Sequence, residues 1–385
     1  MLFMASLAGE IPIKSPRTRP RFEERLVRNV LKALKRNGFI GSKVWISGAR
    51  LFVEASEGAE RVIARVFGIH RVAKIRCLFE FDDLDELCRR VEECAREWVK
   101  GKKFALRVHR VGKHDFTSLD VAREAGAFLR KYSAGVDLEN PEVEVFVEVR
   151  GRRVYIYTNH DVVEGPGGLP LGVEGRALVL FSGSTDSTVA AWLIAKRGVE
   201  VDMLHLIFMD KRSVDVALTI GRKLAREWLY GYSPKMYVVD LRDLVERARK
   251  LVGNSYLQPM LRVFMYIAAS SIAANRGYDT IITGESLGQT PSQTLHDLRV
   301  VENLSSPAVP VIRPLIGLDK EDSVRLSRKL GLYELSSKTT EFSADVEGRT
   351  VTRIEETVLA EVLRRLNARE EISRRCLNPK IYELV

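Results

Sequence analysis

The stretch LVLFSGSTDST, residues 178–188, joins an apolar segment to a run of small, mostly hydroxyl-bearing residues. The apolar part, 178–181, is typical of a strand buried on both faces. The following residues, 182–187, lead into the helical segment TVAAWLIAKRG, so several backbone N–H groups surround one helix N-terminus and predict an anion site. A structural turn with a Ser or Asp N-cap is the alternative. The GxxxxGK(S/T) pattern is absent, which argues against a kinase or GTPase.

Strand-like and helix-like segments alternate on both sides of this stretch. The continuously apolar strands ALVLF, MLHLIF and TIIT are typical of a parallel sheet covered by helices on both faces. They predict a doubly wound parallel α/β domain over residues 166–385. Open sheets of this kind bind ligands at the carboxyl ends of their strands, where the loop 182–187 is expected to lie.

The first 165 residues show a different pattern, which predicts two small α+β units. The first unit is expected to contain a basic amphipathic helix in 14–36, strands at 43–48 and 49–55, a helix at 59–69 and a strand at 72–81. The second is expected to contain a helix at 83–99, a strand at 103–111, a helix at 116–132 capped by Thr117 or Ser118, and a hairpin over 142–158 with one solvated face and its turn at Gly151. The Gly/Pro-rich segment 164–175 marks the clearest boundary. We therefore predict domains at 1–76, 77–165 and 166–385.

The length and charge set limits on the class of protein. A chain of 385 residues corresponds to two or three domains, and 61 Lys+Arg against 51 Asp+Glu give a net charge of +10. Residues 1–165 contain 31 basic and 24 acidic residues, or +7, whereas 166–385 contain 30 and 27, or +3. The positive charge therefore lies mainly in the N-terminal units, where it favours an anionic partner.

The four cysteines, Cys77, Cys88, Cys94 and Cys376, are few and irregularly spaced. They predict neither a disulfide framework nor a structural zinc site, and we expect reduced, mostly buried thiols. No 18-residue apolar run and no charged leader followed by an apolar core is present, so we expect a soluble cytoplasmic protein without a membrane partner.

Several motifs together resemble a known family. The loop Ser182-Gly183-Ser184-Thr185-Asp186-Ser187 resembles the SGGxDS loop of PP-loop ATPases, with Ser184 in place of the second Gly. Further motifs are the GPGGLP hinge, Gly284-Glu285-Ser286-Leu287-Gly288-Gln289, Ser292-Gln293-Thr294-Leu295, Arg313-Pro314-Leu315 and Asp319-Lys320-Glu321. Over nearly the whole chain they resemble the tRNA 4-thiouridine synthetase family, which is also known for sulfur transfer in thiamine synthesis. The resemblance implies a ferredoxin-like domain, a THUMP domain and a PP-loop ATP pyrophosphatase domain.

The resemblance also implies a partner and an RNA-binding half. The segment 114–129 is similar to THUMP sequences, and the family uses the first two domains to hold tRNA, which agrees with the position of the excess charge. For each candidate a simple solvated charge is the alternative. The RNA-binding candidates are Arg17, Arg19, Arg107, Arg110 and Lys113.

For the nucleotide, the resemblance implies ATP and Mg²⁺. Asp186 would hold Mg²⁺ or position phosphates, and Lys320 would neutralise charge that develops on the leaving pyrophosphate or the adenylated uridine. A core histidine and an exposed helix arginine are the structural alternatives for His205 and Arg262. The full set of implied nucleotide contacts, which includes these two residues, is Leu180, Phe181, Ser182, Gly183, Ser184, Ser187, His205, Leu206, Arg262, Gly284 and Gln293.

The sequence departs from the family at the position of its relay cysteine. Sulfur-transferring members have a Glu-Tyr-Cys-like motif where this chain has Thr340-Glu341-Phe342-Ser343, and a hydroxyl cannot carry a persulfide. A substitute role for Cys376 is not favoured. Three hypotheses remain. The first is a thiolase that adenylates a tRNA uridine, usually at position 8, and takes sulfur from free sulfide or a donor protein. The second is an adenylating enzyme with another nucleophile, and the third is a protein that binds RNA and nucleotide without sulfur transfer. The sequence leaves a homodimer open.

Overall fold

The computed structural model describes residues 1–290, 293–337, 351 and 353–385. The chain divides into two compact units, one made of Met1–Arg19 and Val30–Gly167 and the other of Pro20–Asn29 and Gly168–Val385.

The first sheet of the first unit is antiparallel, with the order β10-β4-β1-β3-β2. Its central strand is β1, which was not predicted from the sequence. The predicted helix 59–69 is also shorter in the structure. The elements are β1 (Leu2–Leu7), α1 (Arg19–Arg36), β2 (Lys43–Ser47), β3 (Arg50–Glu54), α2 (Ala59–Ile63), β4 (Ile69–Lys74) and β10 (Val162–Glu164).

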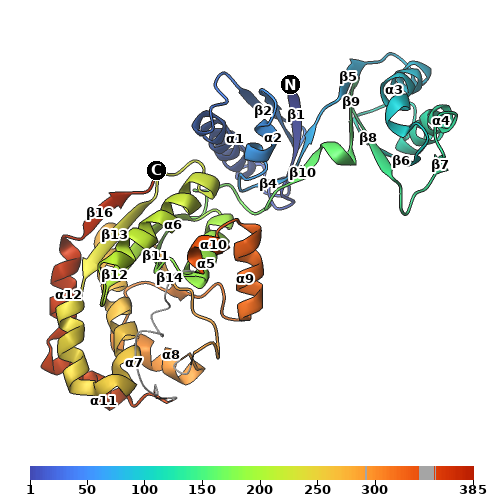
Figure 1. Cartoon of the computed structure of the whole chain (residues 1–385). Helices are drawn as coiled ribbons and strands as arrows, with labels where there is room; N and C mark the ends of the chain where they lie inside the picture. Colours follow the sequence, from blue (N-terminus) through green and yellow to red (C-terminus); the bar gives the residue numbers. More distant parts are fainter. Residues whose placement is uncertain (291–292, 338–350, 352) are drawn as a thin grey trace. The chain divides into compact units, whose positions relative to one another are not determined.

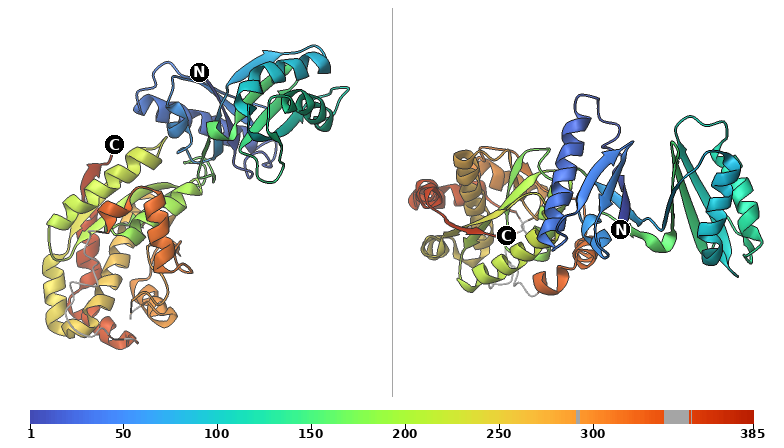
Figure 2. Two further views of the ribbon diagram at one scale, coloured as in Figure 1. Left: turned by 45° about the vertical axis from the view of Figure 1, so that its right-hand side comes forward. Right: turned by 90° about the horizontal axis from the view of Figure 1, so that it is seen from above.

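The second sheet of this unit has the order β5-β9-β8-β6-β7, with α3 and α4 on one face (Figure 2). The strand predicted at 72–81 is in fact two strands, β4 and β5, which belong to different sheets. Thr117 forms the predicted N-cap, in a capping box with Asp120. The elements are β5 (Cys77–Glu80), α3 (Leu84–Val99), β6 (Lys103–Val111), α4 (Ser118–Arg130), β7 (Gly135–Val136), β8 (Val143–Arg150), β9 (Arg153–Thr158) and the 3₁₀ helix Asn159–Asp161.

The hairpin of β8 and β9 does not have the fully solvated face that its alternation predicted. Glu148 is only 3% exposed and accepts hydrogen bonds from Arg150 (2.6 Å) and Arg50 (3.3 Å). Phe52 of β3 packs against Tyr155 of β9, with 5.2 Å between the ring centroids. Sequence alternation identifies two faces of a strand, but it does not identify a neighbouring sheet that covers the polar one.

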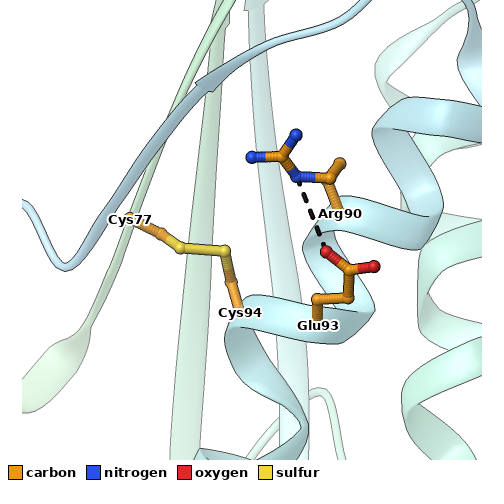
Figure 3. Close-up of a disulfide and its surroundings, with 4 residues drawn as sticks. All are labelled: Cys77, Arg90, Glu93 and Cys94. Carbon is orange, nitrogen blue, oxygen red and sulfur yellow. Dashed lines mark ion pairs between the residues drawn. A yellow bond between two sulfur atoms is a disulfide. The ribbon is translucent and has the colours of Figure 1, made fainter.

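A disulfide joins Cys77 to Cys94 and corrects the expectation of reduced thiols. Figure 3 shows the bond between Cys77, at the start of β5, and Cys94 on α3, near the Arg90–Glu93 ion pair. The two Cα atoms are 6.3 Å apart, because α3 packs back over the sheet that contains β5. Cysteine spacing alone does not reveal that return. Cys88 is a free, buried thiol, as expected.

The disulfide is expected to stabilise the first unit. It closes a loop over a sequence separation of 17, and cross-linking such a loop stabilises a domain by about 3 kcal/mol. We expect the double variant Cys77→Ser/Cys94→Ser to unfold at a temperature lower by roughly 6–12 °C. Reductant should lower the wild-type transition and leave that of the double variant unchanged. An unchanged wild-type transition after complete reduction would contradict a stabilising bond.

The second unit contains a six-stranded sheet with the order β15-β14-β11-β12-β13-β16. The first five strands are parallel, as predicted for β11, β12 and β14, whereas the short strand β15 and the antiparallel edge strand β16 were not predicted. Alternate residues point to opposite faces: Leu178 and Leu204 contribute to the α7 core, whereas Met203 lies against Gly221 of α6. The strands are β11 (Arg176–Leu180), β12 (Glu200–Ile207), β13 (Lys235–Asp240), β14 (Thr280–Ile282), β15 (Val311–Ile312) and β16 (Lys380–Glu383).

Helices cover both faces of this sheet (Figure 1). Helix α5 packs with α6 and α9, and α7 packs with α8, α11 and α12. The alternation of strand-like and helix-like segments predicted such a covering of helices. The helices are α5 (Thr185–Lys196), α6 (Arg212–Trp228), α7 (Arg242–Arg276), α8 (Leu295–Ser305), α9 (Lys320–Lys329), α10 (Tyr333–Ser336), α11 (Glu356–Arg365) and α12 (Ala368–Leu377).

Helix α7 is interrupted at Gly253, whose φ of 65° and ψ of −175° are not helical. Among the described helices, only α7 is long and apolar enough to span a membrane by length and composition. However, 78% of its most apolar window is buried inside the unit, as in the core helix of a soluble domain.

Residues Pro20–Asn29 of α1 belong to the second unit, and there two of its basic side chains form internal contacts. The Arg25 guanidinium donates to Glu200 (2.6 Å) and to the Leu171 carbonyl oxygen (2.7 Å), and Arg21 donates to the Val173 carbonyl oxygen (3.0 Å). Arg21 and Arg25 therefore form contacts within the protein, which the amphipathic pattern of the helix does not reveal.

Candidate functional site

The loop 182–187 connects the carboxyl end of β11 to the N-terminus of α5, as predicted. Gly183 has a φ of +85°, and a Cβ atom there would lie 3.2 Å from the Ala217 Cα, so both conformation and space favour glycine. Ser184 is the N-cap, and its side chain accepts a hydrogen bond from the Ser187 N–H. Ser182 in turn donates to the Ser184 hydroxyl (2.9 Å). The loop therefore presents hydroxyl groups at the N-terminus of a helix.

A cavity of about 260 Å³ lies beside this loop. It brings together nearly all the predicted nucleotide contacts. Gly183 belongs to the loop without lining the cavity. Those that line it are Leu180, Phe181, Ser182, Ser184, Asp186, Ser187, His205, Leu206, Arg262, Gly284 and Gln293.

Asp186 lies in the first turn of α5 and is 8% exposed. Its Oδ2 atom accepts hydrogen bonds from the Lys320 ammonium (2.8 Å) and from the Gln289 amide (2.6 Å). The two predicted catalytic residues are thus in direct contact, although 134 positions separate them. Gln289 belongs to the motif at residues 284–289, but the sequence does not reveal its contact with Asp186.

The other carboxylate oxygen, Oδ1 of Asp186, is buried and has no hydrogen-bond partner among the described residues. Such atoms are rare in folded proteins and indicate a missing ion or water. The described residues contain no group of three or more His, Cys, Asp or Glu side chains arranged to hold a metal. One carboxylate oxygen fits Mg²⁺, which commonly binds through one or two carboxylates together with substrate phosphates and water.

His205 is buried, and both of its ring nitrogens have a hydrogen-bond partner. Its Nδ1–H donates to the Phe181 carbonyl oxygen (3.0 Å), and Nε2 lies 2.9 Å from the Ser213 hydroxyl. Burial lowers its pKa, and the bond to the Phe181 carbonyl opposes this effect only in part. The geometry agrees with the structural alternative, a satisfied core histidine, although His205 also lines the cavity.

Arg262 is buried rather than exposed, so the alternative of a solvated helix arginine is wrong. Its side chain is 8% exposed and donates to the Thr290 hydroxyl (2.9 Å). With the amide of Gln293 oriented to satisfy its neighbours, Gln293 accepts from Arg262 (3.2 Å) and donates to the Ser286 carbonyl oxygen (2.6 Å). Burial lowers the pKa of Arg262, and the negative charge of Glu285 opposes this shift.

Glu285 is the centre of a buried charge network that the sequence analysis missed. One of its oxygens lies 4.0 Å from Arg262 Nε, and the other accepts from Arg313 Nε (3.0 Å) and from the Tyr266 hydroxyl. Arg313 also donates to Glu302 (2.6 Å). The motifs that contain Glu285 and Arg313 were visible in the sequence, but their pairing depends on the adjacent parallel strands β14 and β15.

Replacing Glu285 with glutamine is expected to destabilise the second unit. The substitution leaves the buried guanidinium groups of Arg262 and Arg313 without this counter-charge, and breaking a buried ion pair by removing one partner costs about 3–5 kcal/mol. Urea unfolding measures the loss. The matched control is Glu302→Gln, whose side chain is 38% exposed and should lose less than about 1 kcal/mol. Equal losses in the two variants would contradict a special role for the buried carboxylate.

The predicted RNA-binding side chains differ in availability. Arg17 and Lys113 are exposed, and Arg19 is half-buried. Arg107 donates to Glu144 (3.0 Å) and to the Leu138 carbonyl oxygen (2.7 Å). Arg110 donates to the Gly112 carbonyl oxygen (3.1 Å). Contacts within the protein therefore occupy part of the donor capacity of two of the five candidates.

None of the four cysteines of this chain offers a reactive thiol. Cys376 is 1% exposed, and burial raises its pKa to about 12, so it is not a reactive thiolate. The neighbouring Arg375 pairs instead with Asp243 and Glu371. Of the other three cysteines, two form the disulfide and one is buried. Ser343 and the residues Thr340–Phe342 before it lie outside the described residues.

The parallel sheet, the hydroxyl-rich loop and the two preceding α+β sheets define a PP-loop protein with ferredoxin-like and THUMP domains. Family models agree: "ThiI ferredoxin-like domain" matches residues 7–73, "THUMP domain" 81–159, and "Thiamine biosynthesis protein (ThiI)" 172–361. The chain is 47% identical, over 95% of its length and 76% of the relative's, to the tRNA sulfurtransferase of Desulfurococcus amylolyticus. It is 39% identical to a probable tRNA sulfurtransferase of Saccharolobus solfataricus, over 89% and 90% of the two chains. The chain belongs to the tRNA sulfurtransferase family, and it is an enzyme.

A solved structure agrees with this assignment. The crystal structure of a 4-thiouridine synthetase in complex with RNA and bound ATP is 28% identical and has a TM-score of 0.81, with 99% of each chain covered. The arrangement of the domains in the sequence is therefore that of a known thiouridine-forming enzyme.

Proposed function

We propose that this chain uses ATP to adenylate a uridine of tRNA, with position 8 as the target, so that sulfur replaces O4 and gives 4-thiouridine. The contact between Asp186 and Lys320 beside the α5 N-terminus carries the proposal, because it combines an anion-binding helix end with a fixed cation and an unsatisfied carboxylate oxygen. The family and its RNA- and ATP-bound relative supply the substrates.

In this mechanism, O4 of the uridine attacks the α-phosphorus of ATP, the bond from that phosphorus to the bridging oxygen breaks, and pyrophosphate leaves. A sulfur nucleophile then adds to C4, and AMP departs with O4. The loop 182–187 donates hydrogen bonds to phosphate oxygens, and Lys320 stabilises the negative charge that develops as pyrophosphate leaves. Asp186 would hold Mg²⁺, which neutralises phosphate charge when bound.

The apolar side chains at the ends of β11 and β12 are suited to the base of the nucleotide. Phe181 and Leu206 are buried and line the cavity, so they offer apolar contact area to an adenine ring. The buried Arg262 is a fixed cation on the same cavity and is suited to a phosphate or a ribose oxygen.

We further propose that the sulfur comes from free sulfide or from a donor protein. The reason is that all four cysteines of the chain are either bridged or buried. The same observation favours a thiolase that takes sulfur from an external donor over one that carries sulfur on its own cysteine. The proposal includes a cytoplasmic location. It also assigns tRNA binding to residues 1–165, where the net charge is +7. The domain limits 1–76, 77–165 and 166–385 are part of the proposal. The change from β4 to β5 at Lys74–Cys77 supports the first limit, whereas β10 (Val162–Glu164) pairs with β4 of the first sheet.

The test is to incubate the purified chain with α-labelled ATP, Mg²⁺ and tRNA and to measure AMP and pyrophosphate. Release of both should require tRNA, and adding sulfide should produce 4-thiouridine, measured by nucleoside mass spectrometry. A tRNA with position 8 changed to cytidine is the control. Folded protein that binds tRNA but releases no AMP would exclude adenylation. AMP release without thiouridine would instead favour another nucleophile.

A further inference from the structure

Two donors from different elements meet on one oxygen of Asp186. Lys320 belongs to α9 and Gln289 to the segment between β14 and α8, and both donate to Oδ2, at 2.8 and 2.6 Å. Oδ1 receives no hydrogen bond among the described residues and is buried. The two oxygens of this carboxylate therefore differ. Oδ2 accepts two hydrogen bonds, whereas Oδ1 accepts none from the described residues.

Gln289 is itself held in place from both sides. The preceding Gly288 has a φ of +72° and donates its N–H to the Gln293 carbonyl oxygen (3.1 Å). The following Thr290 accepts a hydrogen bond from the buried Arg262 (2.9 Å). Because these contacts fix the backbone around residue 289, the amide reaches Asp186 from a defined position.

We propose that Gln289 is a positioning residue that, together with Lys320, fixes the Asp186 carboxylate so that Oδ1 stays available for the Mg²⁺ that accompanies ATP. This inference rests on the proposed function. A single flexible lysine contact allows the carboxylate plane to turn, whereas two donors on Oδ2 hold it.

The neutrality of the amide is also part of the argument. Asp186 and Lys320 together have no net charge, and an amide adds a hydrogen bond without adding charge. A second lysine or arginine at position 289 would make the group net positive and would repel a divalent cation. A carboxylate would repel Asp186. Glutamine provides the donor without either effect.

The test compares the wild type with Gln289→Met, which keeps the length of the side chain and removes the donor, and with Gln289→Ala. The matched control is Leu295→Ala, at the start of α8, which is 70% exposed and does not line the cavity. We expect Gln289→Met to lower kcat for tRNA-dependent pyrophosphate release about tenfold, corresponding to ~1.4 kcal/mol, and to raise the half-saturating Mg²⁺ concentration severalfold. The KM for tRNA should stay unchanged, and Leu295→Ala should behave like the wild type.

A second readout does not depend on turnover. Calorimetric titration of ATP at several Mg²⁺ concentrations should show a stronger Mg²⁺ dependence of ATP affinity for the wild type than for both Gln289 variants. Unchanged Mg²⁺ dependence in folded variants would overturn the positioning role, even if kcat fell. If the wild type binds Mg²⁺ and ATP in this way but releases no pyrophosphate, the proposed reaction fails while the role of Gln289 stands. If the wild type binds no ATP, both fail.

Discussion

Asp186→Asn is expected to lower kcat for tRNA-dependent AMP release by roughly 10²–10³-fold, the loss measured when one preorganised electrostatic group is removed from an active site. Asparagine keeps the size of the side chain but removes the negative charge. Lys320 then loses its ion partner at 2.8 Å, and Oδ1 loses the charge that would hold Mg²⁺. The substitution therefore affects both the position of the Lys320 ammonium group and the oxygen proposed to hold Mg²⁺.

Binding of tRNA should not change in this variant, because the residues proposed to hold tRNA lie in the first 165 positions. A filter-binding titration measures it. The matched control is Asp215→Asn, which removes an exposed carboxylate from the first turn of α6 and should leave kcat unchanged. A folded Asp186→Asn protein with more than a tenth of the wild-type kcat would remove Asp186 from the mechanism.

Local patterns were sufficient to predict most of the second unit. Continuous apolar strands occur only where helices cover both faces, so β11, β12 and β14 were recognisable one at a time. The loop 182–187 was recognisable because it combines glycine and hydroxyl residues directly after such a strand. Once the strands are parallel, their carboxyl ends meet at one edge, and this predicts that the loop and Gly284 lie together.

The features that were missed depend on contacts between distant parts of the chain. Strand β1 has no alternating pattern because successive residues of this central strand, Phe3, Met4 and Ala5, are all buried. The Cys77–Cys94 bond requires α3 to fold back over β5. The charge of Glu285 is balanced by Arg313, which lies in another motif 28 positions away. A sequence shows such residues but not their partners, so buried charge networks are the least predictable part of this site.

Gly284→Ala is expected to destabilise the second unit and to impair catalysis. A Cβ atom at residue 284 would lie 2.8 Å from the Asp186 carbonyl carbon and 2.8 Å from the Ser187 backbone nitrogen. These are backbone atoms in the first turn of α5, so they cannot turn aside as a flexible side chain would. The family resemblance implied Gly284 only as a nucleotide contact, whereas the structure shows that the backbone carrying Asp186 lies directly against it.

Relieving this overlap requires either β14 or the start of α5 to move, and overpacking of this kind costs about 1–3 kcal/mol. For a unit of this size we expect the unfolding temperature to fall by roughly 2–12 °C. Because movement of α5 also shifts Asp186 away from Lys320 and Gln289, kcat should fall by roughly tenfold or more, since a misplacement of about 1 Å is enough for a loss up to 10²-fold.

Gly317→Ala is the matched control, because a Cβ atom there meets nothing within 4 Å and the residue does not have a positive φ. It should unfold like the wild type and keep its kcat. Differential scanning calorimetry and the pyrophosphate assay measure both variants. A Gly284→Ala protein with wild-type stability and kcat would show that the β14 end and the α5 N-terminus are not in the close contact on which the geometry of the Asp186 site depends.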